Sequence, residues 1–223
     1  MGKLYIVSTP IGNLEDMTLR AIRILAEADL ILSEDTRRTG ILLKHFKIEK
    51  PQLSYFEFNE EKRIPQVIEK LRTGLNIALV SDAGTPLISD PGFKLVRECV
   101  KLGIKVESIP GASAVLTALT VSSLPTDKFL FLGYLPKTQS KATRILENLK
   151  KIQELQKMTV ILFESPHKLL QTLENLKEVF GDLEIVIARE LTKIHQEIRR
   201  EKISKSISHF QKTKPKGEFT LLF

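Results

Sequence analysis

The sequence has no long apolar run and only one cysteine. No stretch of about eighteen apolar residues occurs, and the opening MGKLYIVSTP enters a strand pattern without a signal-type segment. We therefore expect no membrane association and a cytoplasmic location. A lone cysteine excludes an intrachain disulfide and a cysteine-cluster metal site. Cys99 falls on the apolar stripe of a predicted helix, so we expect a buried thiol.

Several binding motifs are also missing. The first predicted strand is not followed by G-x-G-x-x-G, and no G-x-x-x-x-G-K-[ST] sequence occurs, which argues against dinucleotide-binding and P-loop proteins. No spacing of His, Cys and carboxylate residues predicts a metal site. The basic segment near the C-terminus has no interleaved aromatic residues, so it is suited to gripping a nucleic-acid backbone rather than reading bases.

Positive charge is concentrated in the second half of the chain. The formal net charge is +7; residues 1–120 contribute +1 (16 Lys/Arg and 15 Asp/Glu), and residues 121–223 contribute +6 (18 and 12). Two segments carry most of the excess, Lys137–Lys157 and Lys193–Lys216, and the second contains the basic C-terminal segment, residues 198–216. This asymmetry indicates a polyanion-binding half beside a neutral half. A solvated lysine-rich surface is the alternative.

Alternating apolar and amphipathic segments predict an α/β protein of 223 residues with a mainly parallel N-terminal sheet. The turn-like SSLPTDK places the domain boundary after Ser122, giving domains 1–122 and 123–223. A mixed sheet is expected in the second domain. The expected strands are 3–8, 29–34, 52–56, 76–81, 104–109, 129–135, 158–165, 183–188 and 218–223, and the expected helices are 18–28, 36–46, 60–73, 92–102, 111–123, 138–155, 166–180 and a short one near 204–210.

Three loops in the first half follow strands and combine Gly or Pro with small polar residues: Ser8–Asn13, Ser81–Gly92 and Ile109–Ala114. The carboxyl ends of strands in such sheets form binding crevices, so we expect these loops to converge on one ligand. Gly84 and Gly111 would let the backbone approach it closely. The loops have no lysine or arginine, so a nucleoside fits better than a nucleotide. Tight turns without a ligand are the alternative.

The motifs STPIGNLEDMT, SEDTRRTG, LVSDAGTPLISDPG, IPGASAVLTAL, GYLP, FESPHKL and IARELTKIHQE cover nearly the whole chain in order. In these motifs the chain resembles the tetrapyrrole methylase superfamily (class III methyltransferases), and within it the subgroup acting on small-subunit ribosomal RNA. The resemblance implies a two-domain homodimer that binds S-adenosyl-L-methionine between its domains. It also implies 2′-O-methylation of a decoding-centre cytidine ribose in 16S rRNA, as free RNA or in the small ribosomal subunit. Other members have GxGxG where this chain has STPIG, which disfavours tetrapyrrole substrates.

The resemblance also implies cofactor contacts at particular positions. In the second domain they fall on Phe163, Ala188 and Gly217. In the first domain they fall on Pro10, Ile11, Gly84, Thr85, Ile88, Ser113 and Ala114.

Methyl transfer from a sulfonium is an in-line displacement, so alignment of the acceptor oxygen should dominate catalysis, with help from a base or hydrogen-bond acceptor. The candidate residues at strand ends are Asp35, Arg37, Arg38, Asp82, Glu164 and His167, and the general base is left unassigned. Helix capping is the alternative for Asp35, loop support for Asp82, and a surface or capping role for His167. At least one of the two arginines is expected to contact RNA phosphate.

Two rival functions follow from the same residues. A related methylase acting on a tetrapyrrole or a diphthamide precursor is the enzymatic rival. A non-catalytic RNA-binding or ribosome-assembly module is the rival without catalysis, and it predicts no affinity for S-adenosylmethionine.

Overall fold

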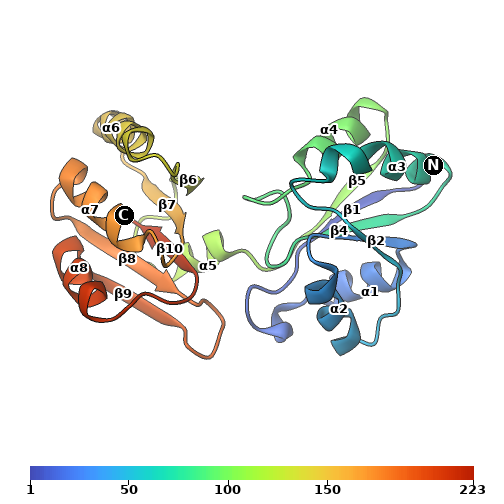
Figure 1. Ribbon diagram of the computed structural model, residues 1–223, viewed down its shortest axis with the longest axis horizontal. Helices are drawn as coiled ribbons and strands as arrows, with labels where there is room; N and C mark the ends of the chain where they lie inside the picture. Colours follow the sequence, from blue (N-terminus) through green and yellow to red (C-terminus); the bar gives the residue numbers. More distant parts are fainter. The chain divides into compact units, whose positions relative to one another are not determined.

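The computed structural model describes residues 1–223 and divides into two compact units, Met1–Ser113 and Ala114–Phe223 (Figure 1). The boundary predicted after Ser122 lies nine residues further along. The difference arises because helix α5 (Ala114–Thr120) packs against strand β10 (Phe219–Leu222), which belongs to the second unit. No helix is both long and apolar enough to cross a membrane.

The first unit contains a five-stranded parallel sheet with the order β3-β2-β4-β1-β5. Its strands are β1 (Leu4–Val7), β2 (Leu30–Ser33), β3 (Gln52–Ser54), β4 (Ile77–Val80) and β5 (Val106–Ile109). Its helices are the 3₁₀ turn η1 (Leu14–Asp16), α1 (Leu19–Glu27), α2 (Thr36–His45), α3 (Glu60–Arg72) and α4 (Phe93–Lys101). Because all strands run the same way, their carboxyl ends share one edge of the sheet.

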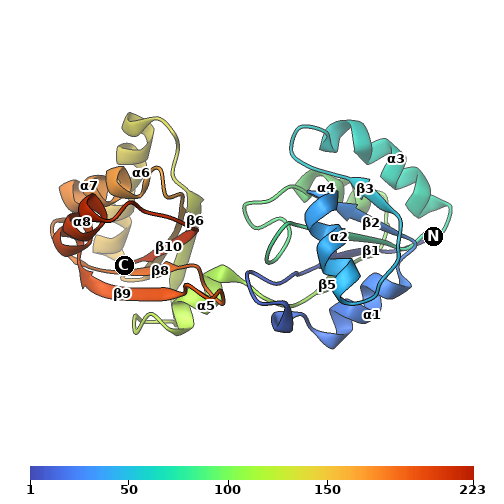
Figure 2. The same ribbon diagram turned by 60° about the horizontal axis from the view of Figure 1, so that its bottom comes forward.

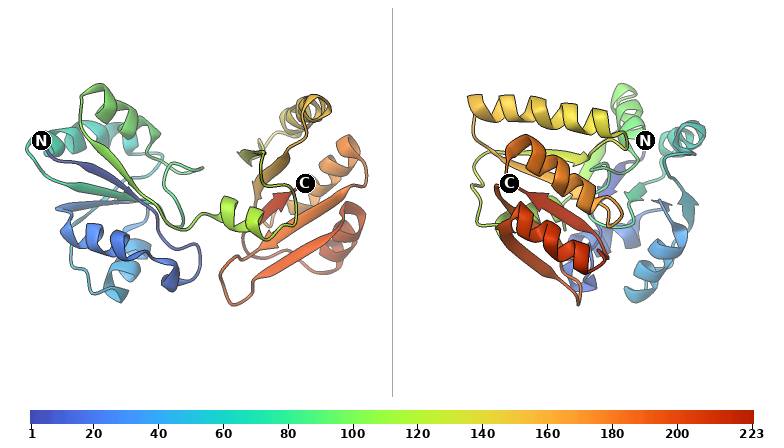
Figure 3. Two further views of the ribbon diagram at one scale, coloured as in Figure 1. Left: turned by 180° about the vertical axis from the view of Figure 1, so that it is seen from behind. Right: turned by 60° about the vertical axis from the view of Figure 1, so that its left-hand side comes forward.

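Helices cover both faces of this first sheet (Figure 3, left). Apolar residues of α1 and α2, such as Leu25 and Leu43, form one core with Ile31 and Val80. On the other face α3 and α4 pack against Leu4, Leu32 and Leu79. Cys99 of α4 is free and buried in this second core, as predicted, and burial raises its thiol pKa to about 11. Near-continuous apolar strands are expected where both faces of a sheet are covered.

The second unit has a mixed five-stranded sheet with the order β6-β7-β10-β8-β9. Its strands are β6 (Phe129–Tyr134), β7 (Thr159–Glu164), β8 (Glu184–Arg189), β9 (Glu197–Lys202) and β10. β6 and β7 are parallel, whereas β10 pairs antiparallel with both β7 and β8, and β9 is antiparallel to β8. The expectation of a partly antiparallel sheet is confirmed.

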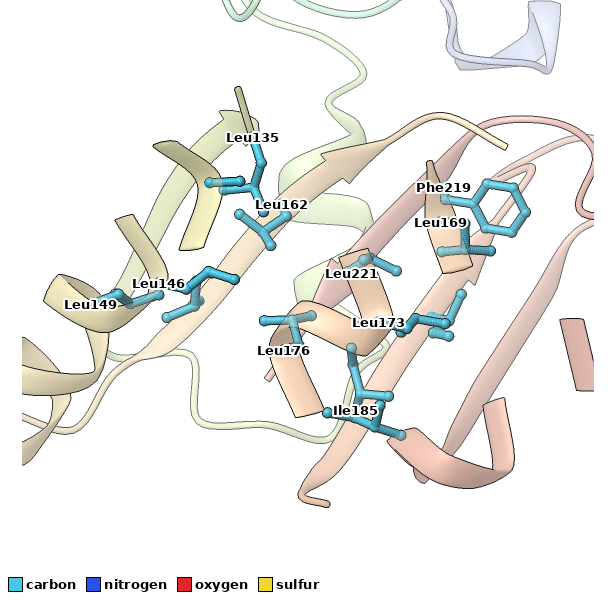
Figure 4. Packing of buried hydrophobic residues seen from close by; sticks show 14 of the residues in the cluster. Leu135, Leu146, Leu149, Leu162, Leu169, Leu173, Leu176, Ile185, Phe219 and Leu221 are labelled. Carbon is cyan, nitrogen blue, oxygen red and sulfur yellow. The ribbon is translucent and has the colours of Figure 1, made fainter. Parts of the chain in front are cut away.

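Three helices cover one face of this sheet: α6 (Gln139–Leu155), α7 (Leu169–Phe180) and α8 (Ile203–Lys212) (Figure 2; Figure 3, right). Figure 4 shows leucines of α6 and α7 packed on Leu162, Ile185 and Leu221 of the strands. Strand neighbours point to opposite faces, so Phe163, Ala188 and Thr220 point away from this core. The second face of the sheet, to which these three residues point, is the face available to α5, which packs against β10.

Candidate functional site

In the first unit, the three loops that the sequence singled out meet at the carboxyl edge of β1, β4 and β5. Thr9 and Gly84 exchange two backbone hydrogen bonds, with N···O distances of 2.8 and 3.0 Å. The Thr9 hydroxyl also donates to the carbonyl oxygen of Ser81, at 3.3 Å. The loops after β1 and β4 are therefore joined through their backbones.

A chain of hydroxyl groups extends this connection to the loop after β5. The Thr85 hydroxyl donates to the carbonyl oxygen of Ala112 at 3.1 Å and lies 3.0 Å from the Ser8 hydroxyl. Because Thr85 has one proton to give, Ser8 donates to Thr85. All three loops are thus fixed to one another by small uncharged groups.

Two glycines allow this close approach. A Cβ on Gly111 would lie 2.9 Å from the Cβ of Ser8, and one on Gly84 would lie 3.2 Å from the Ile11 side chain. Gly84 also has φ +76°, in the left-handed region. Ile11 itself is buried, whereas Pro10 and Thr85 are half-buried.

The loop Ser81–Gly92 has unusual backbone angles at residues that are not glycine. Leu87 and Ser89 have φ values of 73° and 67°. Such conformations carry strain and persist where the surroundings fix them. Ile88 between them is 44% exposed, although its side chain is apolar. The loop therefore presents an apolar residue to solvent from a constrained backbone.

Carboxylates lie beside these loops, after β2 and β4. Asp82 accepts a hydrogen bond from the backbone N–H of Asp35 at 3.0 Å, and its own N–H donates to Glu34 at 3.3 Å. Asp35 caps α2 by accepting from the N–H of Arg37 at 2.9 Å. Asp35 therefore caps a helix and Asp82 supports the loop, which are the alternatives to a catalytic role that the sequence left open.

Burial raises the pKa of Glu34, and it raises the pKa of Asp90 to about 6, with help from the negative charges of Glu34 and Asp82. Hydrogen bonds from Arg37 lower the pKa of Asp35. The carboxyls of Glu34, Asp82 and Asp90 lie near one another and make this edge favourable for a positive charge.

The two arginines of SEDTRRTG belong to separate ion pairs, as expected for neighbours on a helix. Arg37 lies 2.6 Å from Asp35, and Arg38 lies 3.3 Å from Asp82. Their side chains are 88% and 65% exposed. Both retain free N–H groups that face solvent.

In the second unit, Phe163 and Ala188 lie in different strands with Thr220 of β10 between them. The register pairs Phe163 with Thr220 and Thr220 with Ala188, so the three form one row across β7, β10 and β8. Phe163 is half-buried and contacts the rings of Phe131 and Tyr134, with centroid distances of 4.8 and 5.7 Å. The row is small and apolar at one end and aromatic at the other.

Gly217 lies just before β10, against Glu190. It has φ +91°, and a Cβ there would lie 2.6 Å from the Glu190 side chain. Glu190 accepts from the N–H of Glu218 at 2.9 Å and pairs with Lys193 at 3.0 Å. The positive φ and the close Glu190 side chain together favour glycine at this position.

Glu164 and His167 have different surroundings. Glu164 is 3% exposed and accepts hydrogen bonds from the N–H of Ser165 at 2.7 Å and the hydroxyl of Thr172 at 2.5 Å. It anchors the start of α7, which begins at Leu169 rather than at the predicted Pro166 because residues 166–168 form a turn. His167 is exposed in that turn.

The structure brings Pro10, Ile11, Gly84, Thr85 and Ile88 together in the first unit, with Ser113 ending that unit and Ala114 opening α5. Three residues that lie beside these positions, Ser8, Asp90 and Thr220, were not singled out from the sequence. Ser8 and Asp90 lie inside the quoted motifs, so their polarity was a usable signal. Thr220 had no signal, because its place depends on where the last strand inserts. No cluster of three or more His, Cys, Asp or Glu is arranged to hold a metal ion.

Comparison with known families places this geometry among methylases. The family model for tetrapyrrole (corrin/porphyrin) methylases matches residues 3–206. A Thermotoga maritima protein named ribosomal RNA small subunit methyltransferase I is 52% identical over 222 residues, covering 100% of this chain and 98% of its own length. The Bacillus subtilis protein of the same name is 47% identical, covering 100% of this chain and 75% of its own.

Solved structures share the fold at low identity. Diphthine synthase gives a TM-score of 0.75 with 16% identity over 100% of this chain and 90% of its own. Uroporphyrin-III C-methyltransferase from Thermus thermophilus, complexed with S-adenosylhomocysteine, gives 0.66 with 16% identity over 99% of this chain and 97% of its own.

Proposed function

The chain belongs to the tetrapyrrole methylase family, in its ribosomal RNA small subunit methyltransferase I branch, and uses S-adenosylmethionine; on that premise we propose that it methylates the ribose 2′-hydroxyl of a decoding-centre cytidine in 16S rRNA. The observation that carries the proposal is the 52% identity to the Thermotoga maritima relative over essentially both full chains. The matched region includes every loop described above.

The residues of the first unit fit the cofactor. The joined loops have close backbone approach at Gly84 and Gly111 and no cationic side chain, as an uncharged adenosine requires. The carboxyls of Glu34, Asp82 and Asp90 favour the positive sulfonium. Pro10, Ile11, Gly84, Thr85, Ile88 and Ser113 would hold the cofactor from this unit, and Ala114, Phe163, Ala188 and Gly217 from the other.

When bound, S-adenosylmethionine supplies an activated methyl group, so the protein's task is alignment of the acceptor oxygen. Rigid loops suit that task, because Thr9, Ser8 and Thr85 fix them to one another. The ribose proton needs an acceptor, and the half-buried Asp90 has a pKa near that of a useful base. Glu164, the last residue of β7, is fully engaged by Ser165 and Thr172, so we assign it a structural role at the start of α7 rather than a part in the reaction.

The acceptor side of the proposal rests on charge. Residues 121–223 carry a formal charge of +6, against +1 for residues 1–120. A neutral first unit suits the cofactor, and a basic second unit suits a phosphate backbone. Arg37 and Arg38, exposed at the start of α2, would add contacts from the first unit.

We further propose a cytoplasmic homodimer, as expected for an enzyme of ribosome modification in this branch. Leu116 and Val121, which are 52% and 39% exposed, lie in the apolar segment Leu116–Pro125, which we propose as the dimer contact. Sedimentation equilibrium of the purified protein tests the dimer, and a monomer at micromolar concentration would contradict it.

The test of function is transfer of labelled methyl from S-adenosylmethionine to small ribosomal subunits lacking the native modification, with nuclease mapping of the label. We expect label on one decoding-centre cytidine ribose. Label elsewhere would change the site but keep the reaction. No label on subunits or free 16S rRNA, with cofactor binding intact, would reject an RNA acceptor and redirect the search to tetrapyrroles and protein side chains.

A further inference from the structure

A concave site lies in the second unit, away from the row of Phe163, Thr220 and Ala188. It is a pocket of about 410 Å³ at the end of α8 and in the loop before β10. This volume falls in the range of ligand sites, roughly 300–1,000 Å³. Its lining includes Arg189, Glu197, Phe210, Lys212, Lys214 and Lys216.

The charge in this pocket is predominantly positive. Glu197 is its only acidic residue, and both of its oxygens are already taken, by Arg189 at 3.2 Å and by Arg199 at 2.9 Å. Lys212, Lys214 and Lys216 are exposed and have no ion-pair partner. Three unneutralised ammonium groups around one hollow create a field that attracts an anion.

The other lining residues of the pocket are fixed by packing and hydrogen bonds. Phe210 is 4% exposed and contacts Phe219 at a ring-centroid distance of 5.7 Å. The guanidinium of Arg189 donates to the carbonyl oxygen of Lys216 at 2.7 Å while it pairs with Glu197. Arg189 thereby fixes the loop that carries the lysines to strands β8 and β9.

This arrangement divides the basic segment 198–216 into two parts. Arg199 pairs with Glu197 and Glu201 and lies over the Phe210 ring, and Arg200 donates to the carbonyl oxygens of Val121 and Ser122. These two arginines hold the unit together. The lysines of the pocket do not, so they remain available to a ligand.

The position of the pocket relative to the row of Phe163, Thr220 and Ala188 restricts which ligand can reach both. Arg189 follows Ala188 directly, and Lys216 precedes Gly217, but Arg189 lies on the helix-covered face and Ala188 on the other. A molecule that reaches both sites must pass around the edge of the sheet. A long flexible polyanion can do so, whereas a compact acceptor cannot.

The helix terminus at the pocket also favours a diffusely bound polyanion over a tightly held phosphate. The pocket is at the C-terminal end of α8, where carbonyl oxygens rather than N–H groups are free. Tightly held terminal phosphates prefer helix N-termini with several N–H donors. Side-chain ammonium groups alone suit the diffuse, salt-sensitive binding of phosphodiesters along a strand.

We infer that this lysine pocket, defined by Lys212, Lys214 and Lys216, binds the phosphodiester backbone of the RNA substrate on the helix-covered face of the sheet, opposite the row of Phe163, Thr220 and Ala188. The inference deepens the proposed function and rests on it. It assigns to the three lysines a role in RNA affinity and none in cofactor binding.

The test compares two triple variants of the full protein. One is Lys212→Gln/Lys214→Gln/Lys216→Gln. The matched control is Lys141→Gln/Lys151→Gln/Lys157→Gln, at exposed unpaired lysines of the same unit, with the same change in net charge. Affinity is measured for S-adenosylmethionine and for a single-stranded RNA of about sixteen nucleotides between about 50 and 200 mM salt.

For the pocket variant we expect the slope of log affinity against log salt to shrink by about two, which makes the affinity loss across that salt range about sixteen-fold smaller. The control should match the parent, and all three should bind S-adenosylmethionine equally. Equal slopes for pocket variant, control and parent would overturn the inference while leaving RNA methylation intact. Displacement of the RNA by millimolar cytidine monophosphate from the parent would also overturn it, in favour of a mononucleotide site.

Failure of the proposed function is recognised separately, by the parent protein. A parent that binds S-adenosylmethionine but neither binds RNA nor methylates small subunits would reject both proposals together. A parent that methylates subunits, with a pocket variant as active and as salt-sensitive as the control, would reject only the pocket.

Discussion

Gly84 combines a left-handed backbone, φ +76°, with a neighbour at close range, since a Cβ would lie 3.2 Å from Ile11. We predict that Gly84→Ala destabilises the fold by about 1–2 kcal/mol through backbone strain. It should also weaken S-adenosylmethionine binding by about tenfold, equivalent to about 1.4 kcal/mol, because Ile11 must move. Urea unfolding and isothermal titration calorimetry measure the two effects.

Gly103→Ala is the matched control. Gly103 has φ +68°, and a Cβ at this position would have no neighbour within 4 Å, so the substitution reproduces the strain without the contact. It should lose similar stability and bind the cofactor like the parent. Equal cofactor affinity in both variants would mean that the loop after β4 is not a cofactor loop.

Asp90 has a pKa raised to about 6, mainly by burial. Its folded form holds a proton more strongly than its unfolded form, whose pKa is near 3.9. The parent's stability therefore falls as pH rises from about 4 through 6. Asp90→Asn should remove this dependence, gaining about 1 kcal/mol on the parent between pH 4 and 7 after allowance for solvent screening. Urea unfolding at pH 4 and pH 7 gives the difference in unfolding free energy between the variant and the parent. A difference that does not change with pH would refute the raised pKa of Asp90.

At the scale of elements, α2 presents two exposed arginines beside the carboxylates. We predict that Arg37→Ala or Arg38→Ala weakens RNA binding and lowers its salt slope by about one, as loss of one phosphate contact does. Cofactor affinity should not change. Lys44→Ala, at the exposed far end of α2, is the control. RNA titrations in which both arginine variants equal the control would exclude α2 from the RNA surface.

Helix α7 depends on one buried carboxylate. Glu164 accepts from Ser165 and Thr172, and charged hydrogen bonds of this kind contribute about 1.5–3 kcal/mol. Glu164→Gln should lower the free energy of unfolding by about 2 kcal/mol, because the new amide cannot accept from both partners. Since the carboxylate is fully engaged, kcat measured well below the melting temperature should stay within about twofold of the parent. A stable variant with abolished turnover would show that Glu164 acts on the substrate instead.

The elements also show how far the sequence could be read. Alternating patterns predicted nearly every strand and helix, because apolar periodicity is a local property. The position of β10 between β7 and β8 was not predictable, since antiparallel insertion depends on contacts distant in sequence. For the same reason Thr220 was missed and α5 was assigned to the first domain. The meeting of the loops at Gly84 and Thr85 was predictable because their motifs are contiguous and follow parallel strands, whereas the pairing of Asp82 with Asp35 and Arg38 required the fold.

At the scale of the whole molecule, two kinds of binding are separated by charge. Cofactor contacts are expected on loops that have no lysine or arginine, and RNA contacts on lysines and arginines that release counterions on binding. With six or more phosphate contacts, RNA affinity should fall by about 10³-fold between 50 and 200 mM salt. S-adenosylmethionine affinity should change by less than about twofold over the same range, because no cationic side chain is present in its loops. Measuring both in one preparation makes each the control for the other. Flat RNA binding would show that the +6 charge of residues 121–223 is only a solvated surface, whereas strongly salt-dependent cofactor binding would mean that a cationic side chain contacts the cofactor, where none is expected.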